Sequence, residues 1–362
     1  MSDLANNTTT MRDILALINS LPEGGGGGVS PNGTAWTPCE AASDISQNYF
    51  EQVLNANGIW VACSSTSGVW YSEDGKYWTL SNLGSSAGCT CVCYGKGVWV
   101  VGGVRTYYST DGKTWTACAL ASGISIVPPV HRANSVFYGG GRFVAFMGGT
   151  SPTGGGAWYS DDGKTWSRGN LTSSTQAGIA MWCEGLWVAV FGAGLSNKGI
   201  WYSTDGINWT ISNFDDGGSS FRSVLSYADG LWVYASEPGY GLRYSTDGAT
   251  WTPSNITEGT FYFVGKLNGL WIAGGAEGYG MYYSSDGKTW TQSHFTGGVN
   301  FGCAENGVCV ATGADALYYS TDGMTWQQCD NDTMYCYIVF YAHGMWVASG
   351  VGLYYSVGWE PS

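Results

Sequence analysis

The sequence predicts an all-β fold assembled from one repeated four-stranded unit. Three observations predict it: a Ser-x-Asp-Gly-x-x-Trp motif recurs along the chain, a Gly-x-Trp-Val-Ala element precedes the copies, and 19 Trp and 24 Tyr occur together with 57 Gly. Aromatic residues favour strands and glycine favours turns. The composition is therefore typical of many short strands joined by tight turns.

The Ser-x-Asp-Gly-x-x-Trp motif, called the box turn below, predicts a tight β-hairpin. The Asp side chain can accept hydrogen bonds from the backbone of its own turn, and the Gly can adopt a positive φ. Seven full copies occur, with their aspartates at Asp74, Asp111, Asp162, Asp205, Asp247, Asp286 and Asp322 and their tryptophans at Trp78, Trp115, Trp166, Trp209, Trp251, Trp290 and Trp326. Successive aspartates are 37, 51, 43, 42, 39 and 36 residues apart. Such a period indicates stacked or radially arranged units.

The box turn resembles the Asp-box, or bacterial neuraminidase repeat, of sialidase-like β-propellers, over roughly residues 30–362. The resemblance implies a propeller in which each box lies at the rim, between the third and fourth strands of a blade, and takes no part in catalysis. All seven box aspartates and tryptophans are therefore expected to be structural. Calcium is not expected there, because an isolated Asp-Gly turn does not supply several convergent oxygens.

Two independent counts predict eight blades of four strands. The Gly-x-Trp-Val-Ala element occurs eight times, against seven full box turns and one split copy. The split copy begins at Asn32-Gly33 without a preceding strand, whereas residues 344–349 and 352–356 form two strands without a following box. We expect residues 30–38 to pair with residues 352–356 and close the ring, which removes an exposed edge. Seven blades are the alternative, since they are commoner in the resembled family.

Residues 1–23 differ from the repeats and predict a short amphipathic helix. Thr10 and Asp13 form a capping-box-like start, Pro22 ends the helix, and the apolar residues fall at helical spacing: Met11, Ile14, Leu15, Ile18 and Leu21. A linker over residues 24–29, mostly glycine, separates the helix from the propeller at 30–362. The helix is marginal alone, so it packs either on its own propeller or against copies of itself, with a homotrimer as the expected oligomer. Helix and linker weakly resemble the attachment segments of bacteriophage tail and fibre proteins.

Charge and apolar patterning exclude several classes of partner. The formal net charge of −13 argues against nucleic acid, whose binding needs a basic surface. No apolar run approaches the ~18 residues of a membrane span, and no signal peptide is apparent. We expect a virion protein made in the host cytoplasm, with a cytoplasmic or non-classically exported protein as the alternative.

The eleven cysteines show no zinc-binding spacing, so no metal is expected. Cys89, Cys91 and Cys93 alternate, which predicts that all three lie on one face of a strand. Without a secretion signal, reduced and buried thiols are expected, although disulfides stay open if the protein reaches the outside of a cell.

The connections between strands predict where binding takes place. The turns between first and second strands and the box turns are regular and lie on one side, whereas the remaining connections vary in length and lie on the other. Function is usually carried by variable loops on a rigid scaffold. The candidate ligand-binding residues are therefore aromatic and acidic residues of these loops: Phe214, Asp215, Asp216, Glu237, Tyr240, Glu277 and Tyr279.

The sequence gives little support for catalysis, and no catalytic residue or cofactor is assigned. A sialidase needs an arginine cluster, and the resembled family carries an Arg-Ile-Pro type motif, but none of the seven Arg here is followed by x-Pro. Glu237 and Glu277 occupy equivalent loops, so a glycosidase that uses two carboxylates stays open. We predict a non-catalytic binding protein of a phage tail that recognises a cell-surface glycan or protein, with its helix binding other virion proteins. The alternatives are a glycoside hydrolase and a structural assembly module.

Overall fold

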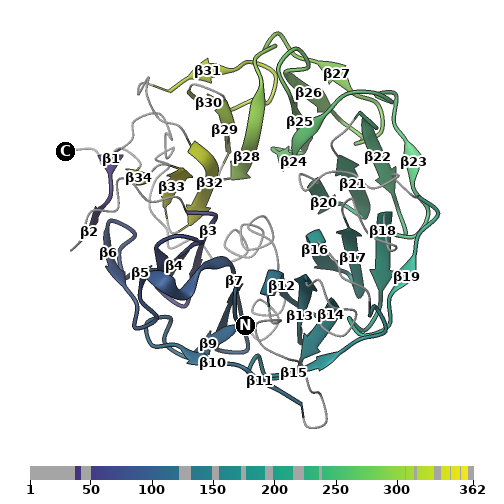
Figure 1. The fold of residues 1–362 in the computed structure, drawn as a ribbon. Helices are drawn as coiled ribbons and strands as arrows, with labels where there is room; N and C mark the ends of the chain where they lie inside the picture. Colours follow the sequence, from purple (N-terminus) through teal and green to yellow (C-terminus); the bar gives the residue numbers. More distant parts are fainter. Residues whose placement is uncertain are drawn as a thin grey trace, which may run out of the picture.

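The chain folds as an eight-bladed β-propeller in a computed structural model (Figure 1). The structure describes residues 37–41, 50–121, 132–148, 155–172, 177–191, 199–214, 224–235, 239–305, 307–313, 316–329, 336–342, 344–350 and 352–357. The predicted count of eight four-stranded antiparallel blades is confirmed. The helix predicted at residues 10–21 and its glycine linker lie outside the described residues.

Blades 1 to 4 follow one another along the chain, each running from the ring axis outward. Blade 1 contains β3 (Gln52–Ala56), β4 (Ile59–Ser64), β5 (Gly68–Ser72) and β6 (Tyr77–Leu80). Blade 2 contains β7 (Cys89–Gly95), β8 (Val98–Gly103), β9 (Tyr107–Ser109) and β10 (Thr116–Ala117). Blade 3 contains β12 (Arg132–Gly139), β13 (Arg142–Gly148), β14 (Gly156–Ser160) and β15 (Thr165–Arg168). Blade 4 contains β16 (Ala177–Cys183), β17 (Leu186–Phe191), β18 (Gly199–Ser203) and β19 (Thr210–Ile211).

Blades 5 to 8 repeat this order, and blade 8 takes its outermost strand from the N-terminal part of the chain. Blade 5 contains β20 (Val224–Ala228), β21 (Leu231–Ala235), β22 (Leu242–Ser245) and β23 (Thr252–Pro253). Blade 6 contains β24 (Phe261–Leu267), β25 (Leu270–Gly275), β26 (Met281–Ser284) and β27 (Thr291–Gln292). Blade 7 contains β28 (Val299–Glu305), β29 (Val308–Gly313), β30 (Leu317–Ser320) and β31 (Gln327–Gln328). Blade 8 contains β32 (Cys336–Ala342), β33 (Met345–Gly350), β34 (Gly352–Val357) and β1 (Thr37–Pro38).

The ring closes through blade 8, as predicted from the two chain ends. Thr37 and Pro38 pair antiparallel with Tyr355 and Tyr354, and the Cys39 N–H donates to the Leu353 carbonyl at 2.8 Å. At the axis, the first strand of each blade contacts the first strand of the next, and β3 contacts β32 to complete the circle (Figure 1). Both faces of each blade are therefore covered, which explains why second strands such as β8 are buried along their whole length.

The connections divide between two faces of the ring. Turns between first and second strands and box turns lie on one side, the turn face, because four antiparallel strands in order bring these connections to the same end. Connections from second to third strands, and from fourth strands to the next blade, lie on the other side, the loop face. Both central residues of the turn at Asn57 and Gly58 have a positive φ, 50° and 74°, as a type I′ hairpin turn requires.

Neighbouring blades are joined at the rim in two ways. In one, an asparagine four residues after a box tryptophan bonds the backbone of the next box: the Trp209 N–H donates to Asn170 Oδ1 at 2.8 Å, and Asn170 Nδ2 donates to the Trp209 carbonyl at 3.0 Å. In the other, a short strand adds parallel to the next blade, as β2 (Glu40–Ala41) does on β6 and β11 (Ala119–Leu120) on β15. Next to β11, the Cys118 thiol also donates a hydrogen bond to the Gly163 carbonyl of blade 3, with the sulfur 3.5 Å from the oxygen.

The cysteines of β7 do not share one face, and that prediction is wrong. Cys89 packs in the core toward blade 1, whereas Cys91 and Cys93 pack toward blade 3. The reason is a register shift between Cys89 and Cys91, which pair with the adjacent residues Gly103 and Gly102. The described cysteines are free thiols, and burial raises the pKa of Cys91 to about 12.

Candidate functional site

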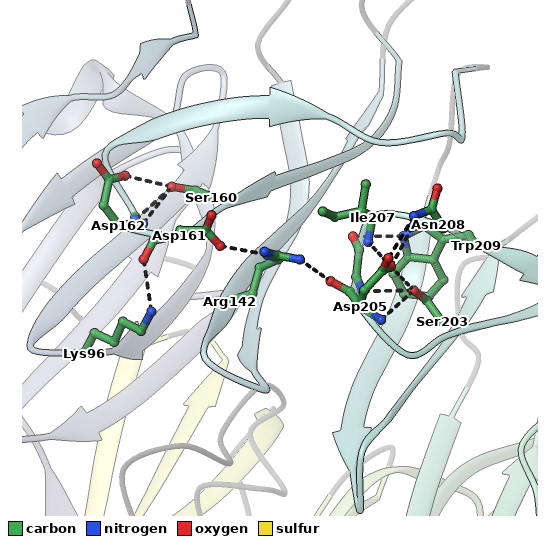
Figure 2. A network of polar contacts seen from close by, with 12 residues as sticks. Lys96, Arg142, Ser160, Asp161, Asp162, Ser203, Asp205, Ile207, Asn208 and Trp209 are labelled. Atoms are coloured by element: carbon green, nitrogen blue, oxygen red, sulfur yellow. Dashed lines mark hydrogen bonds and ion pairs between the residues drawn. The ribbon is translucent and has the colours of Figure 1, made fainter.

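The serine and the aspartate of each box turn form hydrogen bonds within their own turn. In blade 4, the Ser203 hydroxyl donates to Asp205 Oδ1 at 2.9 Å, and the backbone N–H groups of Ile207 and Asn208 donate to the same oxygen at 2.8 and 2.7 Å (Figure 2). Partial desolvation raises the pKa of Asp205, but these bonds and one from the Asn208 amide outweigh it and lower the pKa to about 2. The aspartate is thus committed to holding the turn.

Two structural features of the box turn require glycine after the aspartate. Gly206 has a φ of 71°, and an added Cβ would lie 2.9 Å from Val144 Cγ2 of the preceding blade and 3.1 Å from Trp187 Nε1. The box tryptophans are buried with the exception of Trp326, which is half-buried. Trp209, for example, is 3% exposed, and its Nε1 donates to the Gly206 carbonyl at 3.2 Å. These positions therefore hold the rim together.

Charged side chains of the turn face also form hydrogen bonds to neighbouring blades. Arg142 Nε donates to Asp161 Oδ1 at 2.8 Å in its own blade, and Arg142 Nη1 donates to the Asp205 carbonyl of blade 4 at 2.6 Å (Figure 2). Lys96 of blade 2 donates to the Asp161 carbonyl at 3.2 Å. An open hollow of about 280 Å³ lies beside this network, lined by Tyr159, Ser160, Asp161, Asp162, Thr165 and Ser167. Since its carboxylates already serve these bonds, we assign it no ligand.

On the loop face, the turn that carries Glu277 and Tyr279 is held firmly in place. The Tyr279 N–H donates to the Ala276 carbonyl at 2.9 Å, and the Ala276 N–H donates to the Thr260 carbonyl at 2.9 Å, which ties the turn to the connection from blade 5. Gln292 Nε2 also donates to the Tyr279 carbonyl at 2.8 Å. Glu277 and Tyr279 are nevertheless exposed, Tyr279 to 38%. They are thus presented to solvent from an ordered backbone.

The other candidate binding residues have different environments. Phe214 is 9% exposed and lies in the core between blades 4 and 5, with its ring centroid 6.0 Å from that of Tyr234 and 6.3 Å from that of Tyr240. Tyr240 is half-buried and occupies the position in blade 5 that Tyr279 occupies in blade 6. Of the predicted set, the structure brings together Phe214 and Tyr240. Three of the candidates lie outside the described residues: Asp215, Asp216 and Glu237.

Two features of the loop face were not predicted from the sequence. Arg243 lies on β22 with its guanidinium carbon 3.9 Å from the Phe214 ring centroid. In addition, six first strands contain a register shift after their first or second residue, which leaves one extra residue in each: Thr90, Asn134, Gly178, Tyr262, Asn300 and Tyr337. Each stands six residues before the following first-to-second-strand turn. That spacing from the turn is the signal by which the sequence could have revealed them.

Within the ranges that the structure describes, no group of three or more His, Cys, Asp or Glu side chains could hold a metal ion. In the same ranges, no helix has the length and apolar character needed to cross a bilayer.

No protein-family model matches the chain, and no curated protein matches it significantly. Solved structures do resemble it. The computationally designed Ika8 protein aligns with a TM-score of 0.64 at 9% identity, over 89% of this chain and 100% of that one. YCF48 bound to D1 peptide aligns with a TM-score of 0.56 at 14% identity, over 91% and 99% of the two chains. An ancestral GH74 enzyme aligns with a TM-score of 0.52 at 15% identity, over 92% of this chain and 55% of that enzyme. At these identities the likeness shows a common propeller fold.

Proposed function

We propose that the protein is a non-catalytic binding protein whose loop face recognises a cell-surface glycan or protein, as a component of a phage tail. The observation that carries the proposal is the exposed pair Glu277 and Tyr279 on a hydrogen-bonded turn of the loop face. An ordered backbone that presents an aromatic ring and a carboxylate loses little conformational entropy when a ligand binds. The turn face uses its polar groups internally, so it offers fewer groups to a ligand.

The likeness to other propellers is consistent with binding but does not choose the ligand. YCF48 was solved with a peptide, and the GH74 protein is an enzyme.

The N-terminal segment resembles the attachment segments of tail proteins, so we propose that residues 10–21 join the protein to other virion proteins. We expect the intact chain to be a trimer and a chain starting at Val29 to be a monomer, as measured by light scattering. Equal monomeric masses would refute this part of the proposal.

The proposal is tested by incubating the intact chain with a glycan array and with outer-surface proteins of candidate host cells, followed by a product assay on every glycan that binds. We expect binding without turnover, and loss of binding in Tyr279→Ala and Glu277→Ala. Tyr77→Ala is the matched control, because Tyr77 is 59% exposed on the fourth strand of blade 1. Turnover of a bound glycan would establish a hydrolase instead. Binding that survives both loop-face substitutions would refute the assignment of the surface.

A further inference from the structure

Arg243 departs from the repeat at one position of the third strands. The residue two places before the third-strand serine is aromatic in seven blades: Trp70, Tyr107, Trp158, Trp201, Tyr282, Tyr318 and Tyr354. In blade 5 the same position holds Arg243. An equivalent such as Trp158 is buried in the core toward the preceding blade, so the repeat places an apolar ring here. A charged residue at a position that the other blades use for packing indicates a role beyond packing.

Blade 7 shows what this position contributes to packing. The ring centroid of Tyr318 on β30 lies 4.7 Å from that of Phe295 in the connection from blade 6. In blade 5, the guanidinium carbon of Arg243 lies 3.9 Å from the ring centroid of Phe214 in the connection from blade 4. Phe214 and Phe295 each stand five residues after a box tryptophan. A tyrosine could therefore pack on Phe214 as well, and the positive charge is not needed for the contact.

The charge of Arg243 has no partner within the part of the chain that the structure describes. Its Nε is buried and no hydrogen-bond acceptor reaches it there. The ion pairs in the same part join other groups: Lys113 with Glu73, Arg142 with Asp161, and Lys266 with Asp229. Burial lowers the pKa of Arg243, so its charged form has lost part of its hydration. Because a desolvated charge is unfavourable until it is paired, an anion that reaches the guanidinium would be stabilised.

Arg243 lies toward the loop face, between blades 4 and 5. It is the second residue of β22, a third strand that begins at the loop face, and its side chain is half-buried. Tyr240, in the connection before β22, is also half-buried and has its ring centroid 6.3 Å from that of Phe214. Arg243 and Tyr240 therefore both pack on one phenylalanine ring. Since β22 pairs with β21 and β23 on its two sides, a ligand would meet these side chains and not a free strand edge.

We propose that Arg243, together with Tyr240 and Phe214, binds a carboxylate side chain of a protein partner. The guanidinium holds its N–H donors in a planar fork that matches the two oxygens of a carboxylate. Because Arg243 is half-buried, an acidic side chain on a slender stem reaches it more readily than a carboxylate attached directly to a sugar ring. The net charge of −13 disfavours polyanions such as sulfated glycans, whereas Arg and Tyr are enriched among the residues that dominate protein interfaces. The inference rests on the proposed binding function and specifies its partner.

The first measurement tests whether Arg243 is free for a ligand. Arg243→Tyr restores an aromatic residue at this position, as in the other seven blades. Without a ligand, the intact variant should melt at the temperature of the parent or a few degrees higher, because an unpaired charge is replaced by a ring that can pack on Phe214. Arg243→Met, which removes the charge and keeps an unbranched side chain, guards against a poor fit of the new ring. If both variants melted several degrees lower, a group of the chain itself would neutralise Arg243, and the proposal would be overturned.

The second measurement applies the intact chain to an array of synthetic peptides, each made with glutamate and with glutamine at one position, and to an array of neutral and carboxylated glycans. We expect a peptide whose glutamate form binds with a Kd about tenfold or more below that of its glutamine form, as the loss of a charged hydrogen bond implies. Arg243→Tyr should bind both forms equally. Arg105→Tyr is the matched control, because Arg105 is exposed in a loop-face connection of blade 2 and carries the same charge. It should retain the preference for glutamate.

The other outcomes separate the site from the broader proposal. A peptide whose glutamate preference is the same in the parent and in Arg243→Tyr would keep the binding function and overturn the site. Binding of carboxylated glycans alone, lost in Arg243→Tyr, would overturn the protein partner. Binding to neither array would also overturn the site, whereas the proposed function would fall only if the outer-surface proteins of host cells failed to bind as well.

Discussion

The turn face and the loop face use polar residues for opposite purposes. On the turn face, Ser203, Asp205 and their equivalents bond the backbone of their own turn, and Arg142 joins two blades. On the loop face, the backbone of the 276–280 turn bonds neighbouring connections and leaves the side chains of Glu277 and Tyr279 exposed. The polar side chains of the turn face thus stabilise their own turns. On the loop face, backbone hydrogen bonds hold the turn, and the side chains stay available to a ligand. The comparison implies that substitutions on the two faces should separate stability from binding.

The largest expected effect comes from Trp209→Ala. The Trp209 ring lies 5.4 Å from that of Phe146 and 6.4 Å from that of Trp187 in the core between blades 3 and 4. Its removal should lower the free energy of unfolding by about 3–5 kcal/mol, measured by urea denaturation. Tyr279→Ala should cost less than about 1 kcal/mol, because much of its surface is already exposed. Equal costs, or a Trp209→Ala variant that loses ligand at unchanged stability, would contradict the division between the faces.

A smaller loss of stability is expected when glycines with positive φ are replaced by alanine, and its size should differ between the two faces. Gly206→Ala on the turn face should cost about 2–4 kcal/mol, because it combines left-handed backbone strain with a Cβ placed 2.9 Å from Val144. Gly278→Ala on the loop face, with a φ of 90° and no heavy atom within 4 Å of the added Cβ, should cost only the strain, about 1–2 kcal/mol. The two variants can be compared in one set of denaturation curves. If they were equally destabilised, packing of the box glycine would contribute nothing.

Features that depend on local sequence could be predicted, whereas features that depend on pairing with another strand could not. The box turns, the count of eight and the pairing of β1 with β34 could be predicted, since they depend on turn chemistry, on a repeat period and on matching fragments. The faces of Cys89 and Cys91 could not, because strand alternation assumes a regular register and the shift between them arises from pairing with β8. Nothing in the sequence pattern marks such a shift except its fixed distance from the next turn.

For the candidate site, the sequence identified loop residues but did not separate the exposed ones from the buried ones. Tyr279 and Glu277 were identified from the variable loops, and both are exposed. Phe214 also belongs to a loop-face connection but is buried, because the Trp251 N–H of the next box donates to Asn213 Oδ1 and the Phe214 ring packs inward against Tyr234. Loop position alone therefore did not distinguish a surface aromatic residue from a core one. Arg243 was missed because its environment is created by Phe214 of a different blade.

An intermediate loss of stability is expected from a substitution of Asn170, which lies in the connection from blade 3 to blade 4. Asn170→Ala removes two hydrogen bonds to the Trp209 backbone, at 2.8 and 3.0 Å, and should cost about 1–2 kcal/mol of stability. Ligand binding should not change, since these bonds lie at the rim. Thermal denaturation gives the cost, and the glycan or protein assay gives the second result. A loss of binding at full stability would move the recognition surface outward to the rim.

The smallest expected effect is a change in acid sensitivity produced by Asp205→Asn. The pKa of Asp205 is about 2 in the folded protein, below its ordinary value of 3.8, because the bonds from Asn208, Ile207 and Ser203 outweigh desolvation. Between these two values the unfolded chain binds a proton that the folded chain does not, so the contribution of Asp205 is present above about pH 4 and is lost as the pH falls toward 2. The asparagine carbonyl can still accept the backbone bonds, so stability at pH 7 should fall by less than for Trp209→Ala, while the decline in stability between pH 4 and 2 should become shallower. Urea unfolding at several pH values measures both. An unchanged slope would mean that the charge on Asp205 contributes nothing to the turn, and the polar groups of the turn face would then differ less from those of the loop face than their hydrogen bonds imply.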